Sequence, residues 1–396
     1  MIKYKEEYLN KIIEIESFLN DLGTISLLGG NSGLVIFYLN LFKLTENEAF
    51  YLKAEALLQN IINTLNIKNH SFDLGAGYSG VFWMLKYASN NNFINLETDF
   101  FDSNMERHLK LYSSDNLKDK KFDFLYGGLS PCLFFLEKNN INDNNYYKDL
   151  IHLLETNSIE DSNGIYWKNT IFTKREDFDK EINLGLAHGI PSIIYFLVKI
   201  YSLGIEKEKS ITLIEKSINW LLAIKNMDKN SNLSVFPSSI MKGESIKYNS
   251  RLGWCYGDLG IASVIWQAGK VTNNKKWKEE AIEIMIRSTK RRNLEDNFVI
   301  DAGICHGTAG IAQIFNRFYW ETNLPEFKET ANYWINETLK MAYHKDGLAG
   351  YKIWTGREDG WINGSGLLEG IIGVGLALIS HISNEEPIWD RCLLLN

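Results

Sequence analysis

A glycine-containing turn that recurs seven times constrains this chain more than any other feature of its sequence. The turn reads G-x-x-[G/S/P], an apolar run follows it at once, and its anchors are Gly30, Gly77, Gly128, Gly189, Gly257, Gly307 and Gly370. Successive anchors lie 47, 51, 61, 68, 50 and 63 residues apart. This is the length of a helix pair with variable loops, a period typical of repeat architectures. Seven such turns predict one closed array, a single domain over residues 1–396.

The segments between the turns alternate in character. Residues 45–48 read TENE, the form of a helix capping box, and the apolar residues that follow form one helical stripe. Similar amphipathic segments lie over 210–224, 277–288 and 325–342. The segments that begin inside the turns are apolar nearly all round, as expected for helices buried on every side. We therefore predict an all-α fold in which seven inner helices are surrounded by seven outer helices, an α/α toroid.

Three segments interrupt this alternation. Residues 139–181 are rich in Asn and Asp and contain GIYWKNTIF, which favours a strand, so we expect an inserted extension or small subdomain there. Residues 230–250 and 344–364 read as long loops, each of which precedes a Gly turn. Loops of this length in a compact fold are frequently functional.

The fifth and sixth turns carry metal-binding side chains at equivalent positions. Alignment of RLGWCYG with DAGICHG puts Cys255 over Cys305 and Tyr256 over His306. Structural zinc sites usually have four protein ligands, whereas three leave the fourth position for a reacting group. Two thiols and one imidazole therefore predict a zinc enzyme whose single metal ion is bound by Cys255, Cys305 and His306.

Further polar side chains are expected at the same end of the fold. If each Gly turn begins an inner helix, the helix N-termini converge there, and their dipoles favour thiolates and other anions. The residue before the anchor is polar only in the later repeats, at His188, Tyr256, His306 and Glu369. Asp123 and Arg251, upstream of their anchors, can reach the same end.

Composition excludes several classes of function. The net charge is −7 and the pI is about 5.6, and the sequence has no basic stripe beyond KRR at 290–292, so nucleic acid is not expected as a partner. The sequence shows neither a signal segment nor an apolar run of membrane-spanning length, which predicts a cytoplasmic protein. Four scattered cysteines do not suit a disulfide framework. Cys132 and Cys392 are interpreted as small buried hydrophobes.

The motifs LAHGIP, WCYG, CHGTAG and LLEGIIGVGLAL, in this order and register, resemble the lanthionine synthetase C family of lanthipeptide cyclases over nearly the whole chain. The resemblance implies a double ring of seven inner and seven outer helices, in agreement with the repeat count. It also implies zinc bound by Cys255, Cys305 and His306. The further active-site residues that it implies are His188, Asp123, Arg251 and Tyr256. One departure is Pro131, where the third turn would usually carry glycine, which bears on the approach of Asp123.

The implied reaction is an intramolecular Michael addition. A cysteine of a dehydrated precursor peptide, made of leader and core, attacks dehydroalanine or dehydrobutyrine and closes a (methyl)lanthionine ring. His188 is expected to carry a proton, and the loops 230–250 and 344–364 are expected to line a groove for the peptide. The resemblance further implies a dehydratase and an exporter as partners in a biosynthetic complex, through which the protein could lie peripherally at the membrane. Trp254 and Trp361 are interpreted as packing residues.

Three alternatives belong to other functional classes. The same zinc centre could bind glutathione and add its thiol to dehydrated residues in trans. The protein could also be a scaffold that binds zinc and peptide without turnover. A glycoside hydrolase on a related α/α barrel is disfavoured because such enzymes need paired carboxylates, whereas the turns here offer cysteine and histidine.

Overall fold

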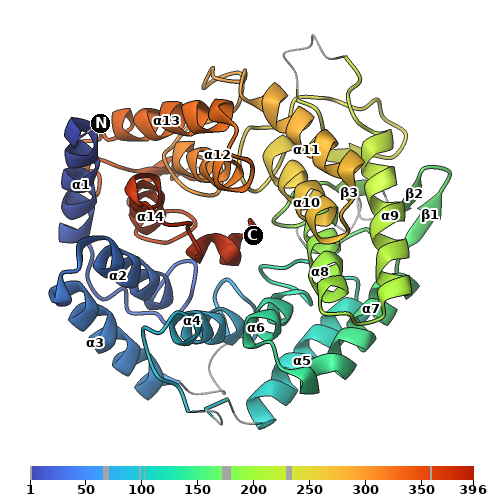
Figure 1. Ribbon diagram of the computed structural model, residues 1–396, viewed down its shortest axis with the longest axis horizontal. Coiled ribbons are helices and arrows are strands. Elements are labelled where there is room, and N and C mark those ends of the chain that lie inside the picture. Colours follow the sequence, from blue (N-terminus) through green and yellow to red (C-terminus); the bar gives the residue numbers. More distant parts are fainter. Residues whose placement is uncertain are drawn as a thin grey trace. The chain divides into compact units, whose positions relative to one another are not determined.

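A computed structural model describes residues 2–65, 71–97, 100–101, 103–171, 180–228, 234–356 and 359–396. These residues form two compact units, and the chain passes from one to the other more than once. Each unit is built mainly from pairs of helices, one of which begins at a Gly turn (Figure 1). We call the helix that begins at a Gly turn the inner helix and its partner the outer helix.

The first unit comprises Met1–Ser71, Gly75–Leu96 and Leu294–Asp390. Its inner helices are α2 (Asn31–Thr45), α4 (Tyr78–Asn90), α12 (Thr308–Thr322) and α14 (Ile371–Ile382). Its outer helices are α1 (Ile2–Ser17), α3 (Glu48–Thr64) and α13 (Pro325–Lys340), and β5 (Ile353–Trp354) pairs with β6 (Trp361–Ile362) in an antiparallel hairpin. The inner helix α14 contacts α1, α2 and α12, while α2 packs on α3 and α12 packs on α13.

The second unit comprises Phe72–Leu74, Glu97–Asn293 and Arg391–Asn396. Its inner helices are α6 (Ser130–Lys138), α8 (Ile190–Ser202) and α10 (Asp258–Val271). Its outer helices are α5 (Ser103–Lys118), α7 (Asn144–Thr156), α9 (Lys207–Ala223) and α11 (Lys275–Ser288). The remaining elements are the 3₁₀ helix η1 (Ile141–Asp143) and the strands β1 (Ile159–Asp161), β2 (Gly164–Tyr166), β3 (Glu181–Asn183) and β4 (Ser239–Met241). The helix η2 (Trp389–Leu393) carries the chain from the first unit into the second.

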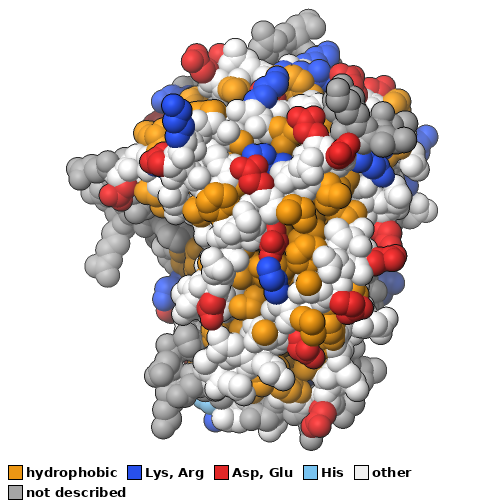
Figure 2. Space-filling view, turned by 90° about the vertical axis from the view of Figure 1, so that its left-hand side faces the viewer, with side chains coloured by type: hydrophobic (Ala, Val, Ile, Leu, Met, Phe, Trp, Pro, Cys, Tyr) orange, Lys and Arg blue, Asp and Glu red, His pale blue; other side chains and the backbone are white. Residues whose placement is uncertain are grey.

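The burial of the two helix classes follows their hydrophobic patterns. In α14 every residue except His381 is buried, whereas α3 buries only Phe50, Ala54, Leu58 and Ile61. The outward side of the outer helices in the first unit is mixed, and Figure 2 shows hydrophobic side chains interspersed with charged ones on the face that carries α1 and α3. Among the described residues, no helix is both long enough and apolar enough to cross a membrane.

The Gly turns begin inner helices as predicted, with one correction of register. Six of the predicted anchors are the N-cap residues of their helices. In the third repeat the structural equivalent is Gly127, not Gly128, because the N–H after it bonds to the carbonyl of Lys121, as the N–H of Thr308 bonds to Asp301. A Cβ on Gly127 would lie 2.5 Å from that carbonyl oxygen. Pro131 therefore does not replace the second glycine of the turn.

In the corrected register, Ser130 stands where most repeats have the second glycine, and Pro131 lies in the first turn of α6. Proline is well tolerated there because the N–H that it lacks has no partner within the helix. The departure expected from the sequence was an error of alignment.

The interrupting segments are only partly irregular. Residues 139–181 supply α7, which contacts α5 and α9, and β1 and β2, which form a hairpin beside α9. The strand expected at Gly164 is present as β2, while residues 172–179 lie outside the described residues. The assignment of 139–181 as a subdomain stays a prediction. The assignment of 1–396 as a single domain also stays a prediction.

The loop 230–250 is anchored to the first turn of α10, although its residues 230–233 lie outside the described part. The carboxylate of Asp258 accepts the N–H groups of Val235 at 3.0 Å and Phe236 at 2.9 Å. Arg291 donates to Asp258 at 2.8 Å and to the carbonyl of Ser250 at 2.7 Å. The basic KRR segment therefore contributes a buried structural arginine. Strand β4 of this loop also pairs with β3.

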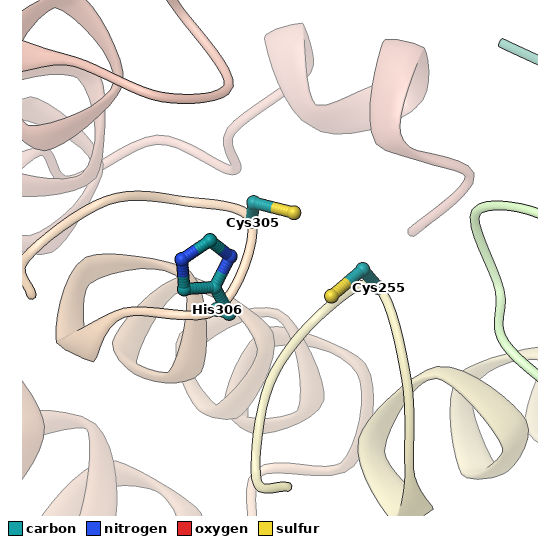
Figure 3. A group of neighbouring side chains, drawn as sticks. All are labelled: Cys255, Cys305 and His306. Atoms are coloured by element: carbon teal, nitrogen blue, oxygen red, sulfur yellow. The ribbon is translucent and has the colours of Figure 1, made fainter. Parts of the chain in front are cut away.

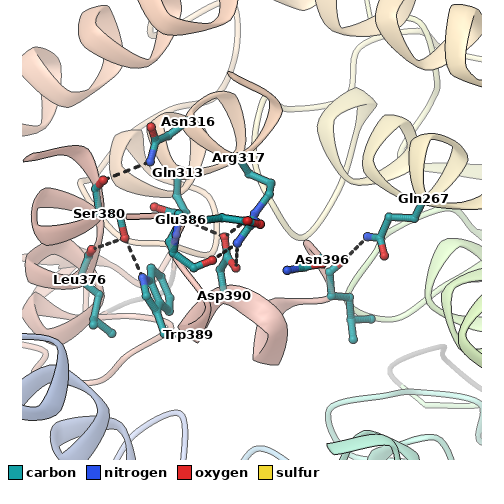
Figure 4. A network of polar contacts seen from close by, with 12 residues as sticks. Gln267, Gln313, Asn316, Arg317, Leu376, Ser380, Glu386, Trp389, Asp390 and Asn396 are labelled. Carbon is teal, nitrogen blue, oxygen red and sulfur yellow. Dashed lines mark hydrogen bonds and ion pairs between the residues drawn. The ribbon is translucent and has the colours of Figure 1, made fainter. Parts of the chain in front are cut away.

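A buried ionic network holds the end of the first unit in place (Figure 4). Arg317 of α12 is 1% exposed, and its guanidinium donates to both carboxylate oxygens of Asp390, at 2.6 and 3.1 Å. It also contacts Glu386 and the carbonyl of Pro387, while Gln313 donates to Asp390 at 2.7 Å. Removal of one buried partner leaves the other charge uncompensated, which costs more than the net stabilisation provided by the intact pair.

We predict that Arg317→Met lowers the free energy of unfolding by about 3–5 kcal/mol, because it leaves Asp390 charged and buried. The double variant Arg317→Met/Asp390→Asn should be more stable than Arg317→Met alone, since the amide carries no charge. Urea unfolding of the wild type, Arg317→Met, Asp390→Asn and the double variant measures the coupling energy between the two side chains. If Arg317→Met were as stable as the wild type, the network would contribute little to the free energy of unfolding.

Candidate active site

The turn before α10 positions Cys255 and Tyr256 in the second unit. Gly257, the N-cap of α10, has φ of +97°, a conformation that L side chains rarely adopt, so the turn requires glycine. The carbonyl of Cys255 accepts a hydrogen bond from the N–H of Ala187 at 3.3 Å, which ties the fifth turn to the fourth. The buried indole of Trp254 donates to the carbonyl of Leu393 at 2.8 Å. Trp254 is therefore a packing residue, as predicted, and it supports the backbone that carries Cys255.

His188 in the fourth turn is paired with Asp123 from the third. The Nδ1 atom of His188 lies 2.5 Å from Oδ2 of Asp123, whose side chain is fully buried, while the His188 side chain is 18% exposed. The other carboxylate oxygen accepts the N–H groups of Leu125 at 2.8 Å and Tyr126 at 2.9 Å. A carboxylate oxygen accepts hydrogen bonds, so the N–H at Nδ1 of His188 is the donor in this pair, and Nε2 is the ring nitrogen that does not face Asp123. The contact with Asp123 therefore fixes the orientation of the His188 ring.

Tyr256 lies near His188, with ring centroids 6.3 Å apart. Its hydroxyl oxygen accepts a hydrogen bond from the side-chain amide of Asn183 at 3.0 Å. Burial raises the pKa of Tyr256 to about 12 despite this hydrogen bond, which lowers it. The phenol is therefore neutral at physiological pH, and it can donate a hydrogen bond to an oxygen that develops negative charge.

Arg251 is a further residue of this unit for which the sequence predicts a role. It lies six residues before Gly257 and is half-buried, and its guanidinium makes no ion pair or hydrogen bond with any described residue. Within the second unit, the structure thus brings together Asp123, His188 and Tyr256, and it leaves Arg251 available for an anionic group.

The turn before α12 positions Cys305 and His306 in the first unit. The N–H of Cys305 donates to the carbonyl of Leu368 in the seventh turn at 3.1 Å. The Nε2 atom of His306 lies 3.5 Å from Oδ2 of Asp301, whose carboxyl group is 1% exposed. The same oxygen accepts the N–H of Trp354 at 3.0 Å, and Oδ1 accepts the N–H of Gly303 at 2.9 Å. Burial alone would raise the pKa of Asp301, but His306 and these N–H groups lower it below its usual value.

The donor atoms of the two turns suit a metal ion (Figure 3). Cys305 and His306 are consecutive residues in the loop before α12, and Cys255 lies in the loop before α10. Together they offer two thiolates and one imidazole nitrogen, the ligand types that zinc prefers. A histidine that binds a metal usually donates its other ring N–H to a carboxylate. Asp301 lies at Nε2 of His306, in the position of such a partner.

The sequence interpretation assigned no role to Asp301 or to Asn183. Both lie six residues before their anchors, as Arg251 does, so the same repeat alignment could have identified this position as polar in three successive turns. Asn169 was also missed, and its amide donates to the carbonyl of His188 at 2.8 Å while its oxygen accepts the N–H of Phe122 at 3.1 Å. Nothing in the sequence around Asn169 points to this contact.

The remaining cysteines have no place in this site. Cys132 and Cys392 are both fully buried, as predicted. Burial raises the pKa of the Cys132 thiol well above its usual value, so it stays a protonated and unreactive group at neutral pH.

A family model and two relatives match the chain. Residues 22–394 match the family model described as "Lanthionine synthetase C-like protein". The chain is 23% identical over 407 residues to the nisin biosynthesis protein NisC of Lactococcus lactis subsp. lactis, covering 95% of this chain and 90% of that protein. It is 24% identical over 174 residues to the glutathione S-transferase LANCL1 of Danio rerio, covering 44% of this chain and 37% of that protein.

The fold is similar to that of a solved structure named nisin cyclase. The two superpose with a TM-score of 0.76 at 17% identity, over 100% of this chain and 98% of the other. This match, together with seven inner and seven outer helices among the described residues, confirms the predicted α/α toroid class.

We predict that Asp123→Asn changes the tautomer of His188, whose neutral ring carries its proton on Nδ1 in the wild type. In the variant the amide oxygen remains with the N–H groups of Leu125 and Tyr126. The NH₂ group then faces the ring and donates to Nδ1, so the proton moves to Nε2. Long-range ¹H–¹⁵N spectra of histidine-labelled protein at alkaline pH distinguish the two forms, and His188→Gln assigns the resonance. An unchanged Nδ1–H tautomer in Asp123→Asn would contradict the role given to Asp123.

Proposed function

The chain belongs to the lanthionine synthetase C-like family, and we propose that it is a zinc-dependent lanthipeptide cyclase that forms (methyl)lanthionine thioether rings. The observation that carries the proposal is the set of Cys255, Cys305 and His306, placed on two Gly turns of a chain that matches the family over residues 22–394. The similarity to the nisin biosynthesis protein NisC and to the fold of nisin cyclase supports the same class of reaction.

The proposed substrate is a dehydrated precursor peptide with a leader and a core. We propose further that the protein works in the cytoplasm beside a dehydratase and an exporter, and that such a complex brings it to the membrane surface. Its net charge of −7 does not favour nucleic acid as a partner.

Cys255, Cys305 and His306 would bind one zinc ion, with Asp301 orienting His306. Zinc, when bound, supplies a positive charge that deprotonates a coordinated substrate thiol at neutral pH. Three protein ligands leave room for that thiol. The buried turns hold the ligands in place, because the backbone of Cys255 bonds to Ala187 and that of Cys305 bonds to Leu368.

The reaction conserves all atoms. The cysteine sulfur adds to the β-carbon of the dehydrated residue, and the electron pair of the carbon–carbon π bond moves to form an enolate. The α-carbon then gains a proton. One proton is lost by the thiol and one is gained by the α-carbon, so the step balances. Through Nε2, His188 can accept the first proton or deliver the second, while Asp123 stabilises the imidazolium that forms between these steps.

Two further residues fit the negative charge that develops on the enolate oxygen. Tyr256 stays a neutral phenol, because its pKa is raised to about 12, and can donate a hydrogen bond to that oxygen. The guanidinium of Arg251, which has no partner among the described residues, can supply a positive charge. We propose both as electrostatic contributors rather than proton carriers.

A second candidate function is the addition of glutathione to dehydrated residues. The partial match to a protein named glutathione S-transferase LANCL1 favours it, but that match covers 44% of the chain, against 95% for NisC. An assay that contains a dehydrated peptide with its own cysteine and an excess of glutathione separates the two functions by product mass. Ring closure without a glutathione adduct supports the cyclase.

We predict one zinc per chain by elemental analysis, with loss of the metal in Cys255→Ser and Cys305→Ser and little change in helical circular dichroism. Asp301→Asn should weaken zinc binding by about 10- to 100-fold, because the amide orients His306 less well. Competition with a chromogenic chelator measures the affinity, and Asp296→Asn, an exposed carboxylate nearby, is the control. A metal-free protein with full cyclase activity would overturn the zinc assignment.

We also predict that His188→Asn slows cyclisation of a dehydrated peptide by about 10²- to 10⁴-fold, because asparagine keeps some hydrogen bonding but cannot transfer a proton. Zinc content should be unchanged, since His188 is not proposed as a ligand. Mass spectrometry after thiol alkylation follows ring closure. A wild-type rate with the same stereochemistry at the protonated carbon would show that the proton comes from another group.

A further inference from the structure

Four aromatic rings of the first unit form a continuous row that the proposed chemistry does not use. The row runs from Tyr343 to His344, Trp361 and Trp354, with successive ring centroids 4.3, 4.6 and 5.4 Å apart. Trp354 and Trp361 are cross-strand partners in the β5–β6 hairpin, so they share one face of it. We call these four residues the aromatic row.

The aromatic row is accessible to a ligand. Tyr343 is 61% exposed, and the other three rings are half-buried. Exposed aromatic groups that lie next to one another are a common feature of binding surfaces. Trp361, interpreted from the sequence as a packing residue, therefore has a free area of ring for contact with another molecule.

The backbone around the aromatic row is held in a defined conformation. The N–H of His344 donates to the carbonyl of Gly350 at 2.9 Å, and the amide of Asn363 donates to the carbonyl of Asp346 at 3.1 Å. Lys352 forms an ion pair with Asp346 at 2.5 Å, so these two charges compensate each other. An aromatic surface whose backbone is held by such contacts favours apolar ligands, because little conformational entropy is lost on binding.

The aromatic row is joined to the candidate metal site through one hydrogen bond. The N–H of Trp354 donates to Oδ2 of Asp301, the same oxygen that lies 3.5 Å from His306. The hairpin and the turn that carries His306 are thus parts of one connected structure within the first unit. The aromatic row is therefore anchored to the same carboxylate that faces His306.

We propose that the aromatic row is a binding surface for apolar side chains of the precursor peptide, in an extended conformation, next to its reacting cysteine. This inference rests on the proposed function for the identity of the peptide. Alternate side chains on one side of an extended chain are about 7 Å apart. Four rings spaced by 4.3 to 5.4 Å can therefore contact two such side chains in succession.

The test uses two synthetic nine-residue peptides that carry a fluorescent label. Both have serine in place of cysteine, so that no thiol can reach a metal, and they differ only in having leucine or serine at two alternate positions. Fluorescence anisotropy gives the dissociation constant of each peptide for the full-length protein. We expect the leucine peptide to bind about ten-fold more tightly than the serine peptide.

Trp361→Ala and Tyr343→Ala should each weaken binding of the leucine peptide by about five- to ten-fold, while Trp361→Phe retains most of the affinity. Tyr343→Ala is informative even if Trp361→Ala does not fold, because Tyr343 is the most exposed ring. Phe18→Ala removes an aromatic side chain that is 45% exposed beyond the end of α1 and should have no effect.

Two results would overturn the inference: equal binding of the leucine and serine peptides by the wild type, or unchanged leucine-peptide binding in both Tyr343→Ala and Trp361→Ala. Elemental analysis and a cyclisation assay of the same proteins test the proposed function separately. Ring-dependent peptide binding by a protein that lacks zinc and activity would support the aromatic row and contradict the cyclase.

Discussion

The architecture of this protein depends on the close approach of backbone to backbone at the Gly turns. A Cβ on Gly310 would lie 1.9 Å from the carbonyl oxygen of Ile304, and one on Gly307 would lie 2.6 Å from that of Asp301. No side chain fits at such a distance, so only glycine allows the loop to fold back over the first turn of α12. The same contact recurs at Gly30 and Gly373, where it starts other inner helices.

The Gly turns also determine where the candidate site residues lie. The two residues before each anchor lie in the folded-back loop, and backbone hydrogen bonds join neighbouring turns at this position within each unit. Cys255 is joined to the fourth turn and Cys305 to the seventh, so the thiols stand on a backbone that has little freedom to move. Within each unit, a residue on such a backbone loses little conformational freedom when it binds a ligand, which reduces the cost of binding.

Each unit pairs an imidazole with a buried carboxylate. Asp123 holds Nδ1 of His188 in the second unit, and Asp301 lies at Nε2 of His306 in the first. Both carboxylates also accept backbone N–H groups, which fixes the direction in which each carboxylate faces its ring. The two carboxylates face opposite ring nitrogens, Nδ1 of His188 and Nε2 of His306. Under the proposed function, His188 is the proton carrier and His306 is a metal ligand.

The sequence alone determined the helical repeat and the equivalence of Cys255 and Cys305, because glycine turns and hydrophobic periodicity are local signals that recur in register. Tertiary structure decided the partners across the chain. Asp123 and His188 are 65 residues apart, and Arg317 and Asp390 are 73 apart, so no local pattern links them. The third repeat was misaligned because Gly127 and Gly128 are chemically identical, and only the hydrogen bond to Lys121 shows which of them begins the helix. Periodicity reports which face of a helix is buried, whereas the pairing of polar groups depends on how distant segments pack.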